Sequence, residues 1–346
     1  MADIKQINYQ KICTSLLKGL PERATEVIVR RFGLKTGENE TLEAIGETYG
    51  ITRERVRQIE REGLSKVKSK MGEYKDVLEY FSKTLDSYGG ARKESSLVSL
   101  FGKEKNYPHI LFLITLSGDI VKHSQDKEFY DFWARNNKLV ESAKQIISHA
   151  INTLNKDKKP VSFDKIFEFE KSNVSSVLNK KADKKIVESY IEISKIIQKN
   201  SEGNFGLKNW VEINPKGIKD RAYLVFKKLG KALHFSEVAQ EIESQFASLN
   251  KKAHVATVHN ELIKDQRFVL VGRGLYALKE WGYEPGVVRE IIVKVMREDN
   301  KPMHKDEIIS AVLKQRMVKE NTVFLNLQNK NYFQRDNSGR YIVKEA

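Results

Sequence analysis

The chain has almost no cysteine: Cys13 is the single one among 346 residues. One thiol excludes an internal disulfide and a zinc site built on several cysteines. We expect Cys13 to be buried and to behave as a small apolar side chain.

Long hydrophobic runs are also missing. A membrane span takes ~20 apolar residues, and the longest run here, Ile110 to Leu116, has only the length of a core segment. The first residues, MADIKQINYQK, lack the hydrophobic stretch of a signal peptide. We therefore expect a cytoplasmic, nucleoid-associated protein with no membrane partner.

The sequence patterns of common enzymes and metal sites are absent as well. No GxSxG or HExxH occurs, and Gly230-Lys231 lacks the flanking residues of a phosphate loop. His234 and His304 occupy equivalent places in a repeat, but no carboxylate at ligand spacing accompanies both, so we interpret them as helix-start residues. We expect no catalytic residues, metal, cofactor or enzymatic activity, although a site assembled from distant residues would leave no such pattern.

The chain does have a large positive charge. Its 61 Lys and Arg residues against 46 Asp and Glu give a net charge of +15. This excess indicates a polyanionic partner, with a basic protein that has no such partner as the alternative. Residues 1–72 carry 14 basic against 10 acidic residues, residues 73–215 carry 23 against 20, and residues 216–346 carry 24 against 16. We expect the C-terminal third to contact nucleic acid as readily as the N-terminal part, and the middle less so.

The segment TLEAIGETYGITRERVRQIEREGLSKVK, residues 41–68, has the pattern of a helix-turn-helix. Thr41 is a good N-cap for a short first helix, a tight turn follows at Gly50, and Thr52 caps a second helix. The residues expected to face the first helix are Val56, Ile59, Gly63, Leu64 and Val67.

The opposite face of the second helix carries chemistry suited to reading bases. The residues that point away from the core, at about 100° per residue, are Glu54, Gln58, Arg61 and Ser65, with Arg55 and Arg57 on the flanks. Arginine matches guanine, glutamine matches adenine, and glutamate accepts from the cytosine amino group in the major groove. The alternative is an ordinary solvated face of an amphipathic helix.

The stretch Leu20–Lys68 closely resembles region 4 of bacterial primary sigma factors. LPERATEVIVRRFGL, TLEAIG and ITRERVRQIE occur in the family's order and spacing. In that family the second helix reads the −35 promoter element, and the first half of the region docks on the flap of RNA polymerase. The resemblance therefore implies two partners, double-stranded promoter DNA and the RNA polymerase core.

The resemblance also implies individual DNA contacts. The matching recognition-helix residues are Arg53, Glu54, Arg55, Arg57 and Gln58, and the residues that match phosphate contacts are Thr41 and Arg23. Arg61, on the same outward face, completes the DNA-binding set. The chain departs from the family at Ala24, where an acid is common, and at Glu62, where a basic residue often follows; both lie outside the base-reading block.

A repeat occupies the C-terminal third. Lys231–Val238 matches Lys301–Ile308 at an offset of 70, and Thr257 matches Thr322 at an offset of 65. We expect a loop near Ser248–Lys252 to absorb the difference of five residues. Each repeat reads as three helices and a hairpin, the layout of a winged helix.

The expected hairpins pair residues 267–270 with 275–278, and residues 332–335 with 341–343. The two repeats together, from about residue 217, resemble the HARE-type helix-turn-helix family, which includes the N-terminal domain of the RNA polymerase delta subunit. That resemblance implies association with nucleic acid or polymerase and identifies no contact residues.

The rest of the chain reads as helices and small modules. Residues 1–20 and 66–86 are expected to be helical, the latter ending at Gly89-Gly90. The aromatic cluster of Phe129, Tyr130, Phe132 and Trp133 is expected to lie in a core, with a base-stacking platform as the alternative.

After the polar break at residues 155–159, we expect a helix that opens within residues 159–166, a second one over residues 186–197 and a short strand or wing over residues 205–210. Together the patterns predict a mainly α fold of tandem helix-turn-helix and winged-helix modules with small β-hairpin wings. The expected domains are 1–72, 73–150, 151–215, 216–283 and 284–346.

Three hypotheses for function follow. The first is a transcription factor that reads a −35-like element and associates with RNA polymerase. The second is a delta-like polymerase accessory protein that uses region 4 mainly as a docking surface. The third is a general DNA-packaging or modification-sensing protein, which predicts a steep salt dependence with little sequence preference.

No stretch of this sequence resembles sigma region 2, the part whose aromatic and basic helix captures the melted −10 strand. We therefore predict that this chain, with core RNA polymerase and no other sigma factor, does not open promoters. In vitro transcription measures this directly, and robust promoter-specific initiation would contradict it.

Overall fold

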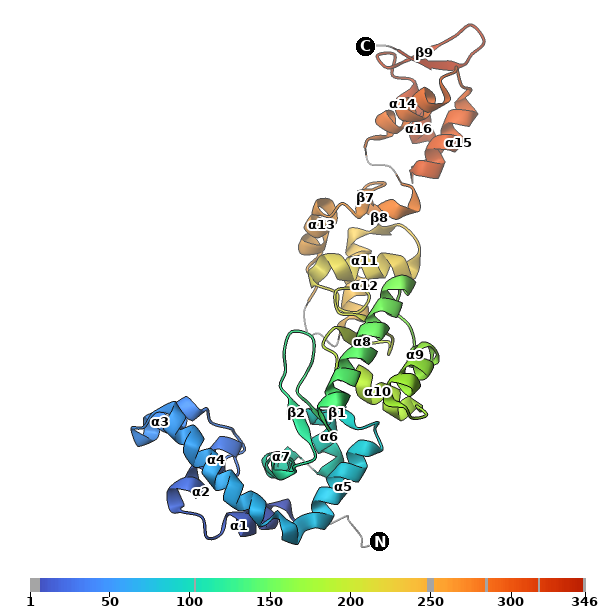
Figure 1. Cartoon of the computed structure of the whole chain (residues 1–346). Helices are drawn as coiled ribbons and strands as arrows, with labels where there is room; N and C mark the ends of the chain where they lie inside the picture. Colours follow the sequence, from blue (N-terminus) through green and yellow to red (C-terminus); the bar gives the residue numbers. More distant parts are fainter. Residues whose placement is uncertain (1–6, 103, 248–251, 284–285, 317, 345–346) are drawn as a thin grey trace. The chain divides into compact units, whose positions relative to one another are not determined.

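The computed structural model describes residues 7–102, 104–247, 252–283, 286–316 and 318–344, and it divides into two compact units, residues 1–213 and 214–346 (Figure 1). Helices dominate both units, and the strands form only two- and three-stranded antiparallel sheets. The expected fold class is therefore confirmed. Within the described ranges, no helix combines the length and apolar character that crossing a membrane requires.

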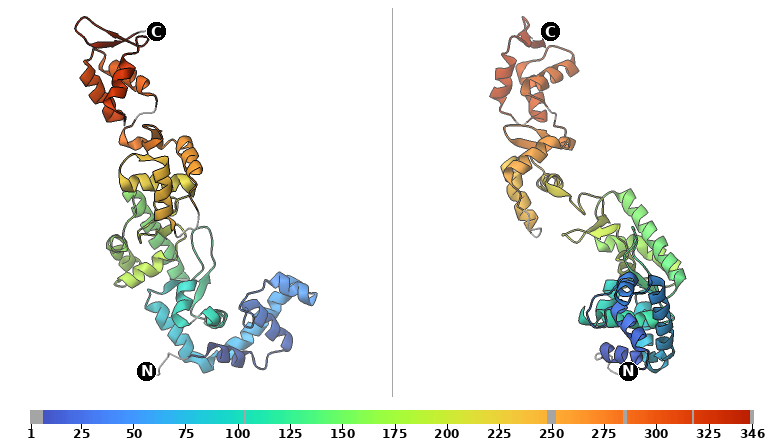
Figure 2. Two further views of the ribbon diagram at one scale, coloured as in Figure 1. Left: turned by 180° about the vertical axis from the view of Figure 1, so that it is seen from behind. Right: turned by 90° about the vertical axis from the view of Figure 1, so that its left-hand side faces the viewer.

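The first unit begins with four helices and no strand, drawn in blue in Figures 1 and 2. They are α1 (Tyr9–Leu17), α2 (Glu22–Phe32), α3 (Leu42–Tyr49) and α4 (Arg53–Ser69). Of the helix expected over residues 1–20, the part from Tyr9 is observed, while residues 1–6 lie outside the described ranges. The thiol of Cys13 is buried in α1, as expected.

A first winged helix follows the four helices. Its elements are α5 (Lys75–Asp86), β1 (Ala91–Lys93), α6 (Glu94–Phe101), α7 (Tyr107–Leu116), β2 (Val121–His123) and β3 (Phe132–Ala134). The single helix expected over residues 66–86 is wrong, because α4 ends at Ser69 and a short 3₁₀ helix, Met71–Tyr74, separates it from α5. A second 3₁₀ turn, Glu104–Asn106, precedes α7.

The second winged helix completes the first unit. Its elements are α8 (Asn137–Asp157), α9 (Phe163–Leu178), α10 (Lys184–Ile191), β4 (Ile197–Lys199) and β5 (Phe205–Leu207). The helix expected over residues 186–197 ends early, because Ser194 accepts hydrogen bonds from the amides of Ile196 and Ile197 and turns the chain into β4. α8 is continuous through residue 150, the site of an expected domain boundary.

The second unit contains two winged helices. The third winged helix comprises α11 (Gly217–Leu229), β6 (Leu233–His234), α12 (Phe235–Gln245), α13 (Val255–Lys264), β7 (Phe268–Leu270) and β8 (Leu275–Leu278), followed by a 3₁₀ turn, Lys279–Trp281. The fourth comprises α14 (Val288–Asp299), α15 (Lys305–Gln315), α16 (Glu320–Leu327), β9 (Phe333–Arg335) and β10 (Tyr341–Val343). Both hairpins lie where the sequence predicts them.

The repeat is visible in detail. His234 and His304 are the N-caps of α12 and α15, and in each case a glutamate three residues on accepts the backbone amide of the histidine at 2.8 Å. The interpretation of both histidines as helix-start residues is confirmed. The expected loop near residues 248–252, which would absorb the five-residue difference, falls mainly on residues 248–251, and these lie outside the described ranges.

Strand β3 joins two hydrophobic cores in the first unit. Successive side chains of a strand point to opposite faces, and all three residues of β3 are buried. Trp133 belongs to the core that contains α1, α5, α6 and α7, whereas Phe132 and Ala134 belong to the core that contains α8, α9 and α10. Because Phe129 is buried in the second of these cores and Tyr130 is half-buried, the expectation of a core aromatic cluster is confirmed.

A buried carboxylate ties the first winged helix together. Glu94 accepts hydrogen bonds from the indole of Trp133 at 2.9 Å and from the hydroxyl of Tyr107 at 2.8 Å, and it pairs with Lys122 at 2.7 Å. Its side chain is only 10% exposed. These contacts connect the starts of α6 and α7 to β2 and β3.

We predict that Glu94→Ala lowers the free energy of unfolding of the first unit by about 3 kcal/mol. The variant leaves the buried indole of Trp133 and the part-buried hydroxyl of Tyr107 without their acceptor, and it removes the nearer of the two carboxylates that pair with Lys122. Urea denaturation followed by tryptophan fluorescence measures this. The control Glu141→Ala removes an exposed carboxylate that pairs only with Lys144 on the surface of α8, and we expect it to change stability by less than about 0.5 kcal/mol. Equal effects of the two variants would contradict the prediction.

Candidate nucleic-acid interface

The local sequence places α3 and α4 in a helix-turn-helix. The hydroxyl of Thr41 accepts the amide of Ala44 at 3.1 Å, and the hydroxyl of Thr52 accepts the amide of Arg55 at 3.2 Å. Between the helices, Gly50 has φ +62°, a conformation that favours glycine. Thr41 therefore starts α3, Gly50 ends it, and Thr52 starts α4.

The turn is compact because α3 and α4 approach closely at Gly46. A Cβ atom at this position would lie 2.6 Å from the carbonyl oxygen of Ile51, so only glycine fits. Val27 from α2, Ile45 from α3 and Val56 from α4 form the small core behind the turn. The inner face expected for α4 is buried at Val56, Gly63 and Val67. Val56 packs with Ile45 of α3, as expected. Gly63 instead lies against Ile28 of α2, and Val67 belongs to the larger core that contains α1 and α7.

The opposite face of α4 is exposed. The exposed residues of the expected DNA-binding set are Arg53, Glu54, Arg55, Arg57 and Arg61 on α4, Thr41 at the start of α3 and Arg23 on α2. Gln58 is half-buried and its amide oxygen accepts a hydrogen bond from Arg55 at 3.1 Å. Six of the eight therefore share the outward side of α4, while the guanidinium of Arg23 lies 5.4 Å from the ring centre of Tyr49 in α3.

The charged side chains of this face bind one another in the free protein. Arg57 donates two hydrogen bonds to Glu54, at 2.8 and 2.6 Å, and Arg53 pairs with Glu43 of α3 at 3.0 Å. The hydrogen bonds from Arg57 lower the pKa of Glu54. A duplex bound to α4 must replace these contacts with its own acceptors and donors.

Two arginines of the sigma-like motif point to the scaffold instead. Arg30 donates to both carboxylate oxygens of Glu40, at 2.8 and 2.5 Å, and to Thr48 at 3.0 Å. Arg31 pairs with Glu60 at 3.5 Å, where burial raises the pKa of Glu60 and the nearby guanidinium opposes that shift. These pairs hold the loop before α3 and the middle of α4. In the sequence, Arg30 and Arg31 follow the buried residues of α2, and this position could have indicated that they bind the scaffold.

The third helices of the four winged helices differ from α4. α7 and α10 are largely buried, with Phe112 and Tyr190 among their fully buried side chains. α13 has Lys264 as its one basic residue, and α16, ENTVFLNL, has none. The exposed arginine cluster therefore lies on α4 and not on α7, α10, α13 or α16.

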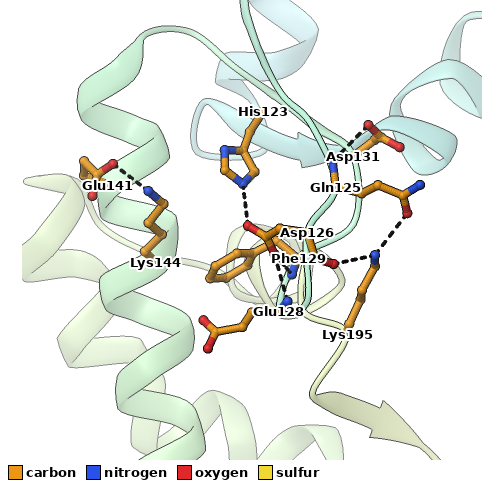
Figure 3. Close-up of polar contacts among 9 residues, drawn as sticks. All are labelled: His123, Gln125, Asp126, Glu128, Phe129, Asp131, Glu141, Lys144 and Lys195. Carbon is orange, nitrogen blue, oxygen red and sulfur yellow. Dashed lines mark hydrogen bonds and ion pairs between the residues drawn. The ribbon is translucent and has the colours of Figure 1, made fainter.

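The wing of the first winged helix is also engaged internally (Figure 3). Lys195, just before β4, donates to the side chain of Gln125 at 3.0 Å and to the carbonyl of Asp126 at 2.7 Å. Asp126 in turn accepts the amides of Glu128 and Phe129 at 2.8 Å each and lies 3.2 Å from His123. The loop between β2 and β3 is thus held against the second winged helix.

No metal centre is visible in the structure as far as it is described: no three His, Cys, Asp or Glu side chains within those ranges converge on one point. The polar clusters named above are ion pairs and caps.

Comparison with known proteins agrees with the geometry of α1 to α4. Residues 16–69 match the family described as Sigma-70, region 4. The RNA polymerase sigma factor RpoS of Coxiella burnetii (strain RSA 493 / Nine Mile phase I) is 43% identical over 65 residues, which is 19% of this chain and 18% of that protein. The RNA polymerase sigma factor SigA of a Bacillus species is 46% identical over 66 residues, 18% of each.

The chain therefore contains a sigma-70 region 4 domain at residues 16–69. The similarity spans less than a fifth of these relatives and of this chain. The family match, residues 16–69, includes every residue of the expected DNA-binding set.

We predict that Glu54→Ala strengthens binding to duplexes of unrelated sequence by a few-fold and reduces discrimination between sequences. The substitution removes a negative charge that faces DNA and releases Arg57, which then contacts phosphates of any sequence. Fluorescence anisotropy with a selected and a scrambled duplex over a range of salt measures both effects. The control is Glu62→Ala, which removes an exposed acid beside the base-reading face; an identical response of the two variants would count against a specific role of Glu54.

Proposed function

We propose that this protein is a DNA-binding transcription factor that reads a −35-like promoter element through α4 and associates with RNA polymerase. The observation that carries the proposal is the exposed face of α4, where four arginines, Glu54 and Gln58 stand on a capped helix-turn-helix within a sigma-70 region 4 domain. Transcription and DNA binding are the functions that this domain and its relatives support.

The proposed base readers are Arg53, Glu54, Arg55, Arg57 and Gln58, with Arg61 beside them. All lie on the N-terminal half of α4, the part of a recognition helix that enters the major groove. Thr41, the N-cap of α3, and Arg23 of α2 are exposed, and we assign them to the phosphate backbone. None of the third helices of the winged helices contains an arginine, although α10 exposes Lys184 and Lys185. This argues against four further DNA readers of the same kind.

A second candidate is supported by the second unit. We propose that its two winged helices are of the HARE type, and two of their third-helix residues, Ile263 in α13 and Leu325 in α16, are 62% and 58% exposed. These two helices carry one lysine and no arginine between them, so they offer little positive charge to a phosphate backbone. They favour a delta-like accessory protein in which the winged helices contact polymerase.

Arg55→Ala separates these functions. We expect it to weaken binding to the preferred duplex by about 1–3 kcal/mol and to relax base choice at one position. Anisotropy with the preferred duplex and its single-base variants measures this, and pull-down with core polymerase reports the protein partner.

The matched control is Arg297→Ala, which removes an exposed arginine from α14 in the second unit. We expect Arg297→Ala to leave base choice unchanged. If Arg55→Ala leaves duplex binding unchanged while polymerase is still retained, the accessory function is favoured. Equal losses on all sequences for both variants would favour a general DNA-packaging protein.

A further inference from the structure

The helix-turn-helix domain has a second apolar face beside its own small core. Val27, Ile45 and Val56 close α3 onto α2 and α4. Ile28 of α2 and Val67 of α4 are fully buried as well, but they belong to a different and larger core. The small core alone closes the turn that presents α4. Because Ile28 and Val67 are buried outside that core, another element must cover the second face.

That element is α7. Its sequence, YPHILFLITL, contains no Asp, Glu, Lys or Arg, and the five residues from Ile110 to Ile114 are all buried. α7 lies against α1, α2 and α4. A helix that is apolar on every side is stable in water only when neighbours surround it.

The contacts between α7 and the domain are specific. The ring of Phe112 meets the ring of Phe32 edge-on, with centres 5.1 Å apart. The thiol of Cys13 in α1 lies 3.7 Å from the carbonyl oxygen of His109. Val67, near the end of α4, belongs to the same core as Phe112. Three helices of the domain therefore share one occupant.

The position of α7 in its own module makes this arrangement unusual. It is the third helix of the first winged helix, the place that a helix-turn-helix uses for its recognition helix. Here that helix has no basic residue and faces inward. The first winged helix therefore packs on the region 4 domain through α7, the helix that in other helix-turn-helix proteins faces DNA.

We propose that α7 is the permanent occupant of this second face, so that no helix of another protein binds there and any polymerase contact of the chain lies elsewhere on its surface. The statement about the polymerase contact rests on the proposed function, and the occupancy of the face by α7 does not. The first unit then presents the region 4 domain to DNA as part of one block with the two winged helices.

The single thiol of the chain reports on this face. Cys13 is 2% exposed, and burial raises its pKa to about 12. Both effects slow alkylation, because the thiolate is the reactive form. Both are lost if α7 leaves, so Cys13 becomes reactive when the face opens.

The experiment treats the full chain with N-ethylmaleimide, alone, with promoter duplex and with core RNA polymerase, and quantifies the modified Cys13 peptide by mass spectrometry. We expect labelling at least ~10³-fold slower than in denaturant in all three states, as for a site exposed only by unfolding. Ser15→Cys, an exposed position on α1, serves as the fast control.

Two outcomes would overturn the proposal. Labelling of Cys13 as fast as the Ser15→Cys control in the free chain would show that the face is open. Fast labelling only in the polymerase complex would show that a partner displaces α7. Slow labelling in a chain that fails to bind DNA or polymerase would count against the proposed function and not against this inference.

Variants test the contact itself. Phe112→Ala removes the ring that meets Phe32 and should speed labelling of Cys13 by more than tenfold, whereas Phe226→Ala, in a separate core of the second unit, should leave it slow. If Phe112→Ala does not fold, the milder Ile114→Val should give a smaller change in the same direction. No change in a folded Phe112→Ala protein would refute the assignment.

Discussion

The first unit depends on a three-residue strand that is buried on both faces. Trp133 of β3 points into the core that holds α1, α5, α6 and α7, while Phe132 and Ala134 point into the core of α8 to α10. The sheet of a winged helix commonly leaves one face to solvent, but here both faces are covered. The cores of the first and second winged helices therefore meet at one shared strand, and side chains from α1, α2 and α4 reach the first of these cores.

This arrangement determines how α4 is presented. A helix-turn-helix on a flexible linker would search for DNA independently, whereas α4 is continuous with a short 3₁₀ helix and α5 and is packed against α7. The carboxylate of Glu94 stabilises the same region by joining α6, α7, β2 and β3. Removing water from this junction makes each of those hydrogen bonds more important to stability.

The net charge of +15 is less informative than the position of individual charges. Arg30 and Arg31 bind carboxylates of the scaffold, and Arg267 joins Asp220 to Asp265 in the third winged helix. The hydrogen bonds from Arg267 lower the pKa of Asp265. Such side chains contribute to the formal charge but offer little free surface to phosphates. The third helices of the basic C-terminal third, α13 and α16, carry one lysine and none.

By itself the sequence determined the local elements: the caps at Thr41 and Thr52, the turn at Gly50, the outward arginines of α4, the repeated His-Glu helix starts and the hairpins of the last two winged helices. Each of these rests on interactions within a few residues, or on a repeat that can be counted. The domain boundaries and the roles of the DNA-binding residues stay predictions. Only the tertiary structure decided that the apolar run of α7 covers the region 4 domain, that β3 serves two cores and that Arg30 faces the scaffold. These depend on contacts between residues far apart in the chain, and the composition of a buried helix does not say which neighbour buries it.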